Sequence, residues 1–246
     1  MTGLILDCTA RTDVGWRPNN EDAVFASPRL AAVADGVGGA AAGEVASRTL
    51  INALIQVDKC RLQGRLEDAL AAGIAWGNET IGFIAACRPA MAGMSTTVTA
   101  VALGDDGCVV ANVGDSRTYL LRDGVLTQLT RDDSWVQLMI DSGELAPEAA
   151  RGHPQRSLVV AALDGEPDRD PALTSFEARP GDRLLLCSEG LSDVVDDDAI
   201  AATLRGAPRA HCAQRLIDLA LAAGGRDNIS AIVADVVPRV DPSTCW

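Results

Sequence analysis

The feature of this sequence that most constrains its fold is a set of four short acidic motifs, each placed where an apolar stretch meets a turn. They occupy residues 34–39 (ADGVGG), 113–116 (VGDS), 187–190 (CSEG) and 226–228 (RDN). Each motif sets one carboxylate beside a Gly, Ser or Asn, which lets the backbone turn sharply. A fifth motif, residues 17–22 (RPNNED), adds one cation and two more acids.

If these motifs meet in the fold, their carboxylates repel one another unless a cation holds them together. Ligands that are all oxygen atoms suit Mg²⁺ or Mn²⁺. The arginine of the fifth motif adds a group that binds phosphate. The pattern therefore indicates a divalent metal site that handles a phosphate.

Composition removes several other classes of protein. The chain has 246 residues, 48% of them hydrophobic and 22% charged, which is an ordinary globular composition that fits one domain. Its net charge of −13 argues against a nucleic-acid partner. Lys59 is the only lysine, so the Gly-Lys pair of a Walker loop is absent, and a Schiff-base mechanism would depend on one lysine in a polar stretch.

The cysteines and the apolar runs bear on the compartment. The seven cysteines are odd in number and none are spaced as Cys-x-x-Cys, which argues against a disulfide framework or a zinc ribbon. No signal peptide is recognised at the N-terminus, and no apolar run approaches about 18 residues. We therefore expect a cytoplasmic protein without a membrane span.

Short β-branched segments and longer amphipathic segments occur in separate groups along the chain. Helices are expected at 43–57, 66–87, 132–142, 197–204 and 208–222. Strands are expected at 4–10, 30–34, 96–103, 108–113, 118–122, 125–129, 183–187 and 229–237. Residues 105–107 (DDG) and 123–124 (DG) are typical hairpin turns. Gly73 and Gly77 either weaken the second helix or let another element pack closely. The grouping predicts an α+β protein with antiparallel sheets and helices packed outside, not a βαβ alternation.

Taken together, the motifs resemble those of the bacterial metal-dependent protein phosphatases of the PP2C type. Nine stretches carry the resemblance, in the order of the family: 11–15, 17–22, 34–39, 43–47, 93–97, 114–117, 153–157, 188–191 and 227–228. The resemblance implies an antiparallel β-sandwich flanked by helices on both sides. It also implies one phosphatase domain over residues 1–246, with a mobile flap at about 143–157.

The resemblance also assigns metal ligands. It implies that Asp35 bridges two ions and that the carbonyl of Gly36 is a further ligand. Asp227 and Glu189 would complete one site, with glutamate at a position where relatives usually have aspartate. Asp115 would help to hold a third, weaker ion that also uses Glu189. Singly, these acids also fit ordinary turns.

Further residues receive supporting roles. Glu21 and Asp22 would accept hydrogen bonds from metal-bound water, with direct ligation by Glu21 as an alternative. Arg17 would bind the substrate phosphate through its guanidinium fork. His153, in the flap, would either contact substrate or pack within its loop. Val37 occupies the position where some relatives have a histidine assigned as general acid.

The leading hypothesis is a cytoplasmic, monomeric serine/threonine protein phosphatase that uses two Mn²⁺ or Mg²⁺ ions. Arg17, Asp35 and Asp227 would be its catalytic residues, and a hydroxide bridging the two ions would attack phosphorus in line. Its partners would be phosphorylated proteins, among them a Ser/Thr kinase of the bacterial eukaryotic-like type.

Two alternatives remain open. A catalytically weak phosphoprotein-binding module is suggested by Glu189, Val37 and Ser95, which stands where relatives often have glycine. A dinucleotide-binding enzyme is suggested by Gly36-x-Gly38-x-x-Ala41 with Asp58 about 20 residues on. Against it, Asp35 would face the pyrophosphate, and the middle of the chain consists of hairpins.

Overall fold

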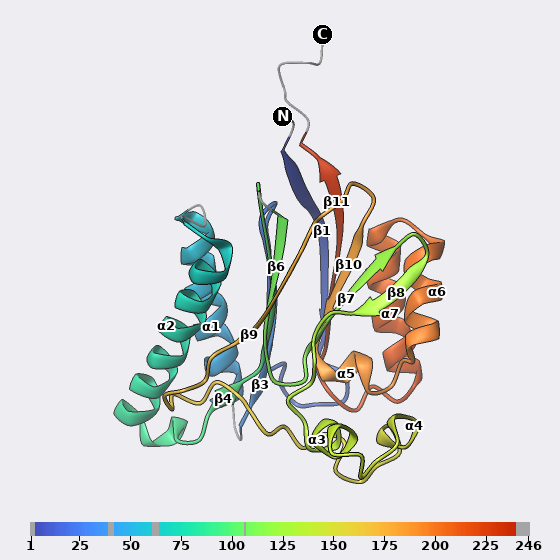
Figure 1. Ribbon diagram of the computed structural model, residues 1–246. Coiled ribbons are helices and arrows are strands. Elements are labelled where there is room, and N and C mark those ends of the chain that lie inside the picture. The colour runs from blue at the N-terminus through green and yellow to red at the C-terminus, as the bar shows by residue number, and fades with distance from the viewer. Residues whose placement is uncertain (1–2, 39–41, 61–63, 106, 240–246) are drawn as a thin grey trace.

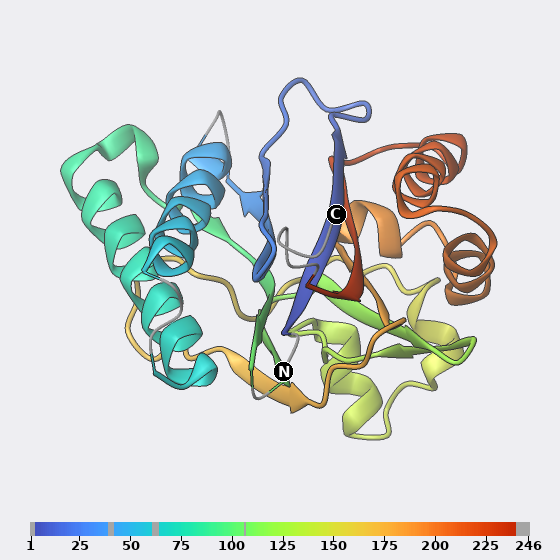
Figure 2. The ribbon, with the colours of Figure 1, turned by 90° about the horizontal axis from the view of Figure 1, so that it is seen from above.

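The protein is built in four layers, helix–sheet–sheet–helix, as Figure 1 shows from the side and Figure 2 from above. The computed structural model describes residues 3–38, 42–60, 64–105 and 107–239. Two sheets face one another in the middle, and a helix pair covers the outer face of each. This is the α+β sandwich predicted from the sequence, and the prediction is confirmed.

The first sheet, here called sheet A, holds the two ends of the chain side by side. Its strand order is β1-β11-β10-β7-β8. The strands are β1 (Leu4–Asp13), β7 (Arg117–Arg122), β8 (Val125–Gln128), β10 (Arg183–Cys187) and β11 (Ile229–Pro238). Strands β1 and β11 pair over ten residues, from Leu4 opposite Pro238 to Asp13 opposite Ile229. The Asp123-Gly124 turn joins β7 to β8 as the sequence predicted.

The second sheet, sheet B, has the order β2-β3-β5-β6-β9, and β4 adds to the end of β3. The strands are β2 (Asp22–Ala26), β3 (Leu30–Val37), β4 (Ser95–Thr96), β5 (Val98–Gly104), β6 (Gly107–Val113) and β9 (Ala172–Phe176). Every strand pair of the described residues is antiparallel. The parallel crossover of a dinucleotide-binding fold is therefore not found in this part of the chain, and Ala41 of that motif lies outside it.

Both faces of the central strands are buried, because side chains alternate between the two sides of a strand. In β3, Leu30, Ala32 and Ala34 face the helices, whereas Ala31 and Val33 face sheet A. The layer between the sheets is closed by apolar side chains such as Leu186 and Ile232, with no exposed area. At one end of this layer, the Thr97 and Ser116 hydroxyls hydrogen-bond at 2.8 Å and those of Thr99 and Thr118 at 2.7 Å.

Helices α1 (Ala42–Lys59) and α2 (Leu66–Cys87) cover sheet B, followed by the short 3-10 helix η1 (Pro89–Met91). Helices α5 (Glu189–Ser192), α6 (Asp197–Gly206) and α7 (Arg209–Ala222) cover sheet A. Helices α3 (Trp135–Asp141) and α4 (Pro147–Ala150) lie at one end of the sandwich (Figure 1).

Close packing between α1 and α2 depends on two glycines of α2. A Cβ added at Gly77 would lie 2.6 Å from Leu50 Cδ1, and one at Gly73 would lie 2.5 Å from Val57 Cγ2. Of the two roles that the sequence left open for these glycines, the close approach of a neighbouring helix is the one observed. By length and composition alone, α2 could also cross a membrane, although 33% of that stretch is buried here. The absence of a membrane span therefore stays an expectation.

The structure differs from the predicted elements in several places, and the short helices η1, α4 and α5 are among the elements not predicted. Strands β2 and β9 were not predicted, and both are edge strands of sheet B. Strand β3 continues to Val37 because Gly36 and Val37 pair with β4, so Asp35 lies inside a strand and not after it. The helix predicted from 132 begins at Trp135, because the Ser134 side chain caps it by accepting a hydrogen bond from Gln137 N at 3.3 Å.

Candidate active site

The acidic motifs meet at one end of the sandwich, where strands of both sheets finish. Asp35 lies near the end of β3, and Asp115 is two residues past the end of β6, so both come from sheet B. Glu189 follows β10, and Asp227 is two residues before the start of β11, so both come from sheet A. With Arg17, these four carboxylates line a single cavity of about 570 Å³.

The backbone around Asp35 is fixed by a pair of threonines. Thr97 N and the Thr96 hydroxyl both donate to the Asp35 carbonyl at 2.9 Å. Next to it, Gly36 and Gly43 approach so closely that a side chain on Gly36 would collide with the Gly43 backbone. The absence of a Cβ at Gly36 thus lets the start of α1 pack directly behind the cavity.

The loop over residues 14–21 forms one wall and is held by Asn228. The Asn228 side chain accepts a hydrogen bond from Glu21 N at 2.8 Å and donates to the carbonyls of Val14 and Asn19 at 2.9 Å. Gly15 has φ +59°, and a Cβ there would collide with the Asp227 carbonyl. This loop is therefore seated on the 225–228 turn through contacts that a larger side chain would block.

Arg17 stands at the mouth of the cavity on this loop. Its Nη2 lies 2.8 Å from Asp227 Oδ2, and its Nε donates to the Arg226 carbonyl at 3.3 Å. The Arg17 side chain is 55% exposed. At the cavity mouth, the guanidinium of Arg17 is paired with one carboxylate, that of Asp227.

Asp22 lies behind the cavity and is buried. Ser188 donates a hydrogen bond to Asp22 Oδ2 at 2.8 Å, and Ser188 Oγ in turn accepts from Ser230 N at 3.0 Å. Burial raises the pKa of Asp22 to about 6, with a further contribution from the nearby charge of Asp227. Glu21 lines the cavity itself, and its backbone carbonyl accepts from Gly36 N and from the Ser47 hydroxyl.

The electrostatics of the cavity are those of crowded, desolvated acids. Burial, followed by the charges of four neighbouring acids, raises the pKa of Asp35 well above its ordinary value. Burial and the charge of Asp132 raise the pKa of Asp115 to about 7. Burial, Asp115 and Asp193 raise the pKa of Glu189 to about 8. In each case burial and neighbouring negative charge disfavour the ionised form of the carboxyl.

The donor set fits a hard divalent cation. One carboxylate oxygen of each of Asp22, Asp115 and Glu189 is buried without a hydrogen-bond partner. Unpaired, buried carboxylate oxygens are costly, and a cation with oxygen ligands satisfies them. Across the described residues, however, no three Asp, Glu, His or Cys side chains already form an arrangement that could hold an ion. These carboxylates therefore line one cavity but are not drawn together around a common point, and Asp227 is paired with Arg17.

Most of the residues that meet here are among those predicted from the sequence. Arg17, Glu21, Asp35, Gly36, Asp115, Glu189 and Asp227 all line the cavity. His153 does not line it: its Nδ1 accepts a hydrogen bond from Gln155 N at 3.2 Å within its own turn.

Three acidic residues near this cavity, Asp132, Asp193 and Asp197, are not among those predicted, and Asp193 is the one bound to the 143–157 segment. Asp193 lines an adjoining cavity of about 180 Å³ together with Asp115 and Glu189. Its carboxylate accepts hydrogen bonds from Arg156 Nε at 2.9 Å and from the Ser157 hydroxyl at 3.3 Å. The signal was present, because Asp193 follows Glu189 by four residues, which is one helical turn.

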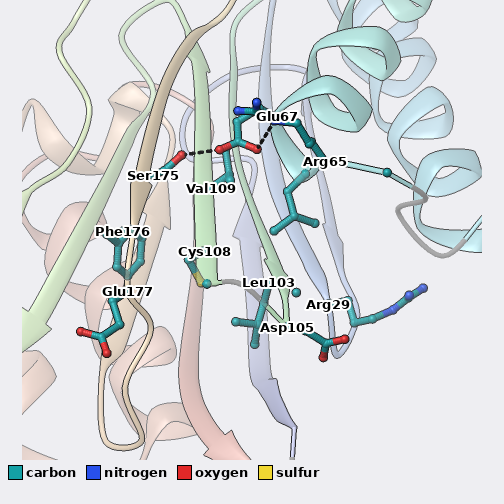
Figure 3. Close-up of a pocket in the computed structure, with 14 residues that line it drawn as sticks. Arg29, Arg65, Glu67, Leu103, Asp105, Cys108, Val109, Ser175, Phe176 and Glu177 are labelled. Atoms are coloured by element: carbon teal, nitrogen blue, oxygen red, sulfur yellow. Dashed lines mark hydrogen bonds and ion pairs between the residues drawn. The ribbon is translucent and has the colours of Figure 1, made fainter.

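The acidic cavity is smaller than another cavity of the protein, so size alone does not identify the site. A cavity of about 650 Å³ lies at the opposite end of sheet B, between the start of α2 and the β5–β6 turn (Figure 3). Leu103, Cys108 and Phe176 contribute to its lining, and Ser175 donates to Glu67 Oε1 at 2.8 Å across it. Its two arginines and three described acids are interspersed, so it lacks the convergent carboxylates that distinguish the smaller cavity.

The fold and the cavity together define a helix-flanked double-sheet protein with an oxygen-rich pocket at the strand ends. Comparison with known proteins shows the family to which a chain of this class belongs. Residues 18–214 match the family model described as protein phosphatase 2C. The chain belongs to the protein phosphatase 2C family.

Individual relatives agree with this membership. The chain is 49% identical over 235 residues to the serine/threonine protein phosphatase PstP of Mycobacterium tuberculosis, covering 95% of this chain and 46% of the relative. It thus spans about half the length of that curated relative. It is 35% identical to the serine/threonine phosphatase stp of Listeria monocytogenes, covering 92% and 94% of the two chains.

A solved structure of the catalytic domain of PstP in complex with two manganese ions superposes with a TM-score of 0.89. The identity is 47%, and the match covers 95% of this chain and 99% of that one.

Proposed function

We propose that this protein is a Mn²⁺- or Mg²⁺-dependent phosphatase that hydrolyses phosphoserine and phosphothreonine in proteins. One observation carries the proposal: four carboxylates from the strand ends of two sheets share a cavity with an exposed arginine at its mouth. The names of the relatives and the two manganese ions in the PstP structure support it.

Asp35, the carbonyl of Gly36, Glu189 and Asp227 are the proposed ligands of the two ions. Asp35 is central because it shares the cavity with acids from both sheets, and burial followed by the charges of those acids raises the pKa of its carboxyl. When bound, the ions supply the Lewis acidity that makes water a nucleophile near neutral pH. The fold holds these carboxylates in one cavity.

The other acids have supporting roles in this proposal. Glu21 and Asp22 orient water at the ions, since Glu21 lines the cavity and Asp22 is fixed by Ser188 behind it. Asp115 and Glu189 contribute to a third, weaker ion. The unpartnered oxygens of both residues and the adjoining cavity that they share with Asp193 support this assignment.

Arg17 is the proposed phosphate-binding residue. Its guanidinium offers paired N–H donors that match two phosphate oxygens. In this structure the guanidinium contacts Asp227, a proposed metal ligand, and if that carboxylate were coordinated the fork would be free to bind a phosphate at the same mouth.

The remaining assignments concern the whole chain. Residues 1–246 are proposed to act as one phosphatase domain, with 143–157 as a flap beside the cavity. The flap is tied down by Arg151, which donates to the Ser192 and Val195 carbonyls, and by the contact of Arg156 with Asp193. Substrate contact by His153 would require the flap to move. We propose a cytoplasmic monomer in bacterial signalling that acts on phosphoproteins, including a Ser/Thr kinase.

The test is turnover of a phosphothreonine peptide by purified protein with Mn²⁺, followed by phosphate release. Asp35→Asn should lower kcat by several orders of magnitude, because a proposed bridging ligand loses its charge. Asp123→Asn, in the β7–β8 turn at φ 51°, is the matched control and should retain activity, since Asn tolerates that conformation. Turnover that persists at full rate with a chelator would refute the proposal.

A further inference from the structure

Apolar side chains form part of the rim of the acidic cavity. Val37, at the end of β3, is 45% exposed, and Leu158 is 47% exposed. Both line the cavity that also holds Arg17 and Asp35. The carboxylates thus form the floor, and aliphatic groups stand open to solvent beside the arginine.

The backbone holds Leu158 next to a second exposed apolar residue. Ser134 and Val159 form an antiparallel bridge, Trp135 N donates to the Leu158 carbonyl at 2.8 Å, and Val160 N donates to the Asp133 carbonyl at 2.8 Å. Residues opposite one another in such a pair place their side chains on the same face. Trp135, which is 41% exposed, and Leu158 therefore form one surface feature, here called the apolar ridge.

The apolar ridge adjoins the cavity, because Leu158 belongs to both. A molecule bound in the cavity could therefore also cover the ridge. Contiguous exposed apolar groups beside a polar site are typical of binding surfaces. A peptide whose phosphate lies at Arg17 brings its neighbouring residue within about 4 Å of the phosphorylated one, measured between Cα atoms. Because Leu158 lines the same cavity as Arg17, that neighbour's side chain is the part of the peptide that we expect to cover it.

We propose that the apolar ridge, with Val37 on the other side, selects phosphorylated segments carrying a large apolar side chain next to the phosphothreonine or phosphoserine. The inference rests on the proposed function and names its substrate class. An extended segment would place its phosphate over the carboxylate floor and its apolar neighbour against Leu158. A polar or charged neighbour would leave the leucine without this contact.

The experiment compares two phosphothreonine peptides that differ only in the residues flanking the phosphothreonine, leucine in one and glutamine in the other. The ratio of their kcat/KM values with Mn²⁺ is the readout, so that any common change in chemistry cancels. We expect the wild-type ratio to be about tenfold, which corresponds to burial of most of one leucine side chain, and to arise mainly in KM.

Variants of Leu158 then locate the preference. Leu158→Gln should bring the ratio close to one, and Leu158→Met should keep most of it, because methionine preserves apolar volume. Leu173→Gln is the matched control: Leu173 is 40% exposed on β9, does not line the cavity, and should leave the ratio unchanged.

The outcomes separate this inference from the proposed function. A wild-type ratio near one, or a ratio unaffected by Leu158→Gln, overturns the ridge assignment while leaving the phosphatase proposal intact. If neither peptide is hydrolysed, the phosphatase proposal fails, and calorimetric titration of the same two peptides decides the ridge assignment on binding alone. Self-association that Leu158→Gln abolishes would assign the ridge to a second copy of the chain and overturn the proposal.

Discussion

Asn228 offers a sharp test of how the loop at 14–21 is held over the cavity. Its side chain is buried and makes three hydrogen bonds to that loop, one accepted from Glu21 N and two donated to the Val14 and Asn19 carbonyls. Asn228→Ala removes all three and leaves the loop's backbone groups without these partners. Because the same loop carries Arg17, the substitution should affect both stability and phosphate binding.

The size of the effect follows from the bond count. A hydrogen bond of this kind contributes about 1 kcal/mol net, and an abandoned buried partner costs about 1–3 kcal/mol. Three such bonds at the edge of the fold give an expected loss of about 3 kcal/mol in the free energy of unfolding. In a protein of this length, 1 kcal/mol changes Tm by about 2–4 °C, so Tm should fall by roughly 6–12 °C.

The assay is thermal unfolding of the chelated protein followed by circular dichroism, with KM for a phosphothreonine peptide measured alongside. Asn52→Ala, at an exposed position of α1, is the matched control and should melt within about 1 °C of the wild type. Asn228→Asp preserves the acceptor for Glu21 N but loses both donors and adds charge to an acidic cavity, so it should also be destabilising. If Asn228→Ala melts with the control, the loop is held by other contacts and the reasoning is wrong.

Three further predictions concern the cavity. Glu189→Asp draws the carboxylate back by about 1.5 Å. If glutamate is adapted to its site, the Mn²⁺ affinity measured by calorimetry and kcat should both fall. A large rise in kcat would instead favour the catalytically weak binding module. Arg17→Lys keeps the charge but loses the fork, so KM for a phosphopeptide should rise about tenfold, and a change below twofold would contradict phosphate binding by Arg17. The carboxyl pKa values of about 6, 7 and 8 for Asp22, Asp115 and Glu189 lie above their unfolded values near 4. Their contribution to the free energy of unfolding is therefore favourable below about pH 4 and is lost as pH rises through the pKa values of the folded protein. Tm measured in chelator should fall between pH 5 and 8, and Mn²⁺ should restore it. A Tm that rises over this range would contradict the direction of the pKa shifts.

Local chemistry explains which elements could be predicted from the sequence. Asp123-Gly124 encodes the β7–β8 hairpin within two residues, because Gly and Asp accept the positive φ that the turn needs. Strand β9 is different: most of its side chains are exposed, so its residues carry little apolar pattern. What makes it a strand is pairing with β6, more than sixty residues earlier, which local reasoning does not reveal.

The same distinction applies to the site. Asp35, Asp115, Glu189 and Asp227 could be named because each stands in the sequence beside a Gly, Ser or Asn and next to an apolar stretch. Their common cavity could only be inferred through the family resemblance, since antiparallel pairing decides which strand ends meet. The contact between Ser188 and Asp22 joins residues 166 positions apart, and no local pattern marks it.

The division of the carboxylates between the two sheets has a mechanical consequence. Asp35 and Asp115 come from one sheet, and Glu189 and Asp227 come from the other. An ion coordinated by residues of both sets would therefore cross-link the two sheets at this end of the sandwich. Pulling the sheets apart in a single-molecule force experiment should then need a higher rupture force in Mn²⁺ than in chelator.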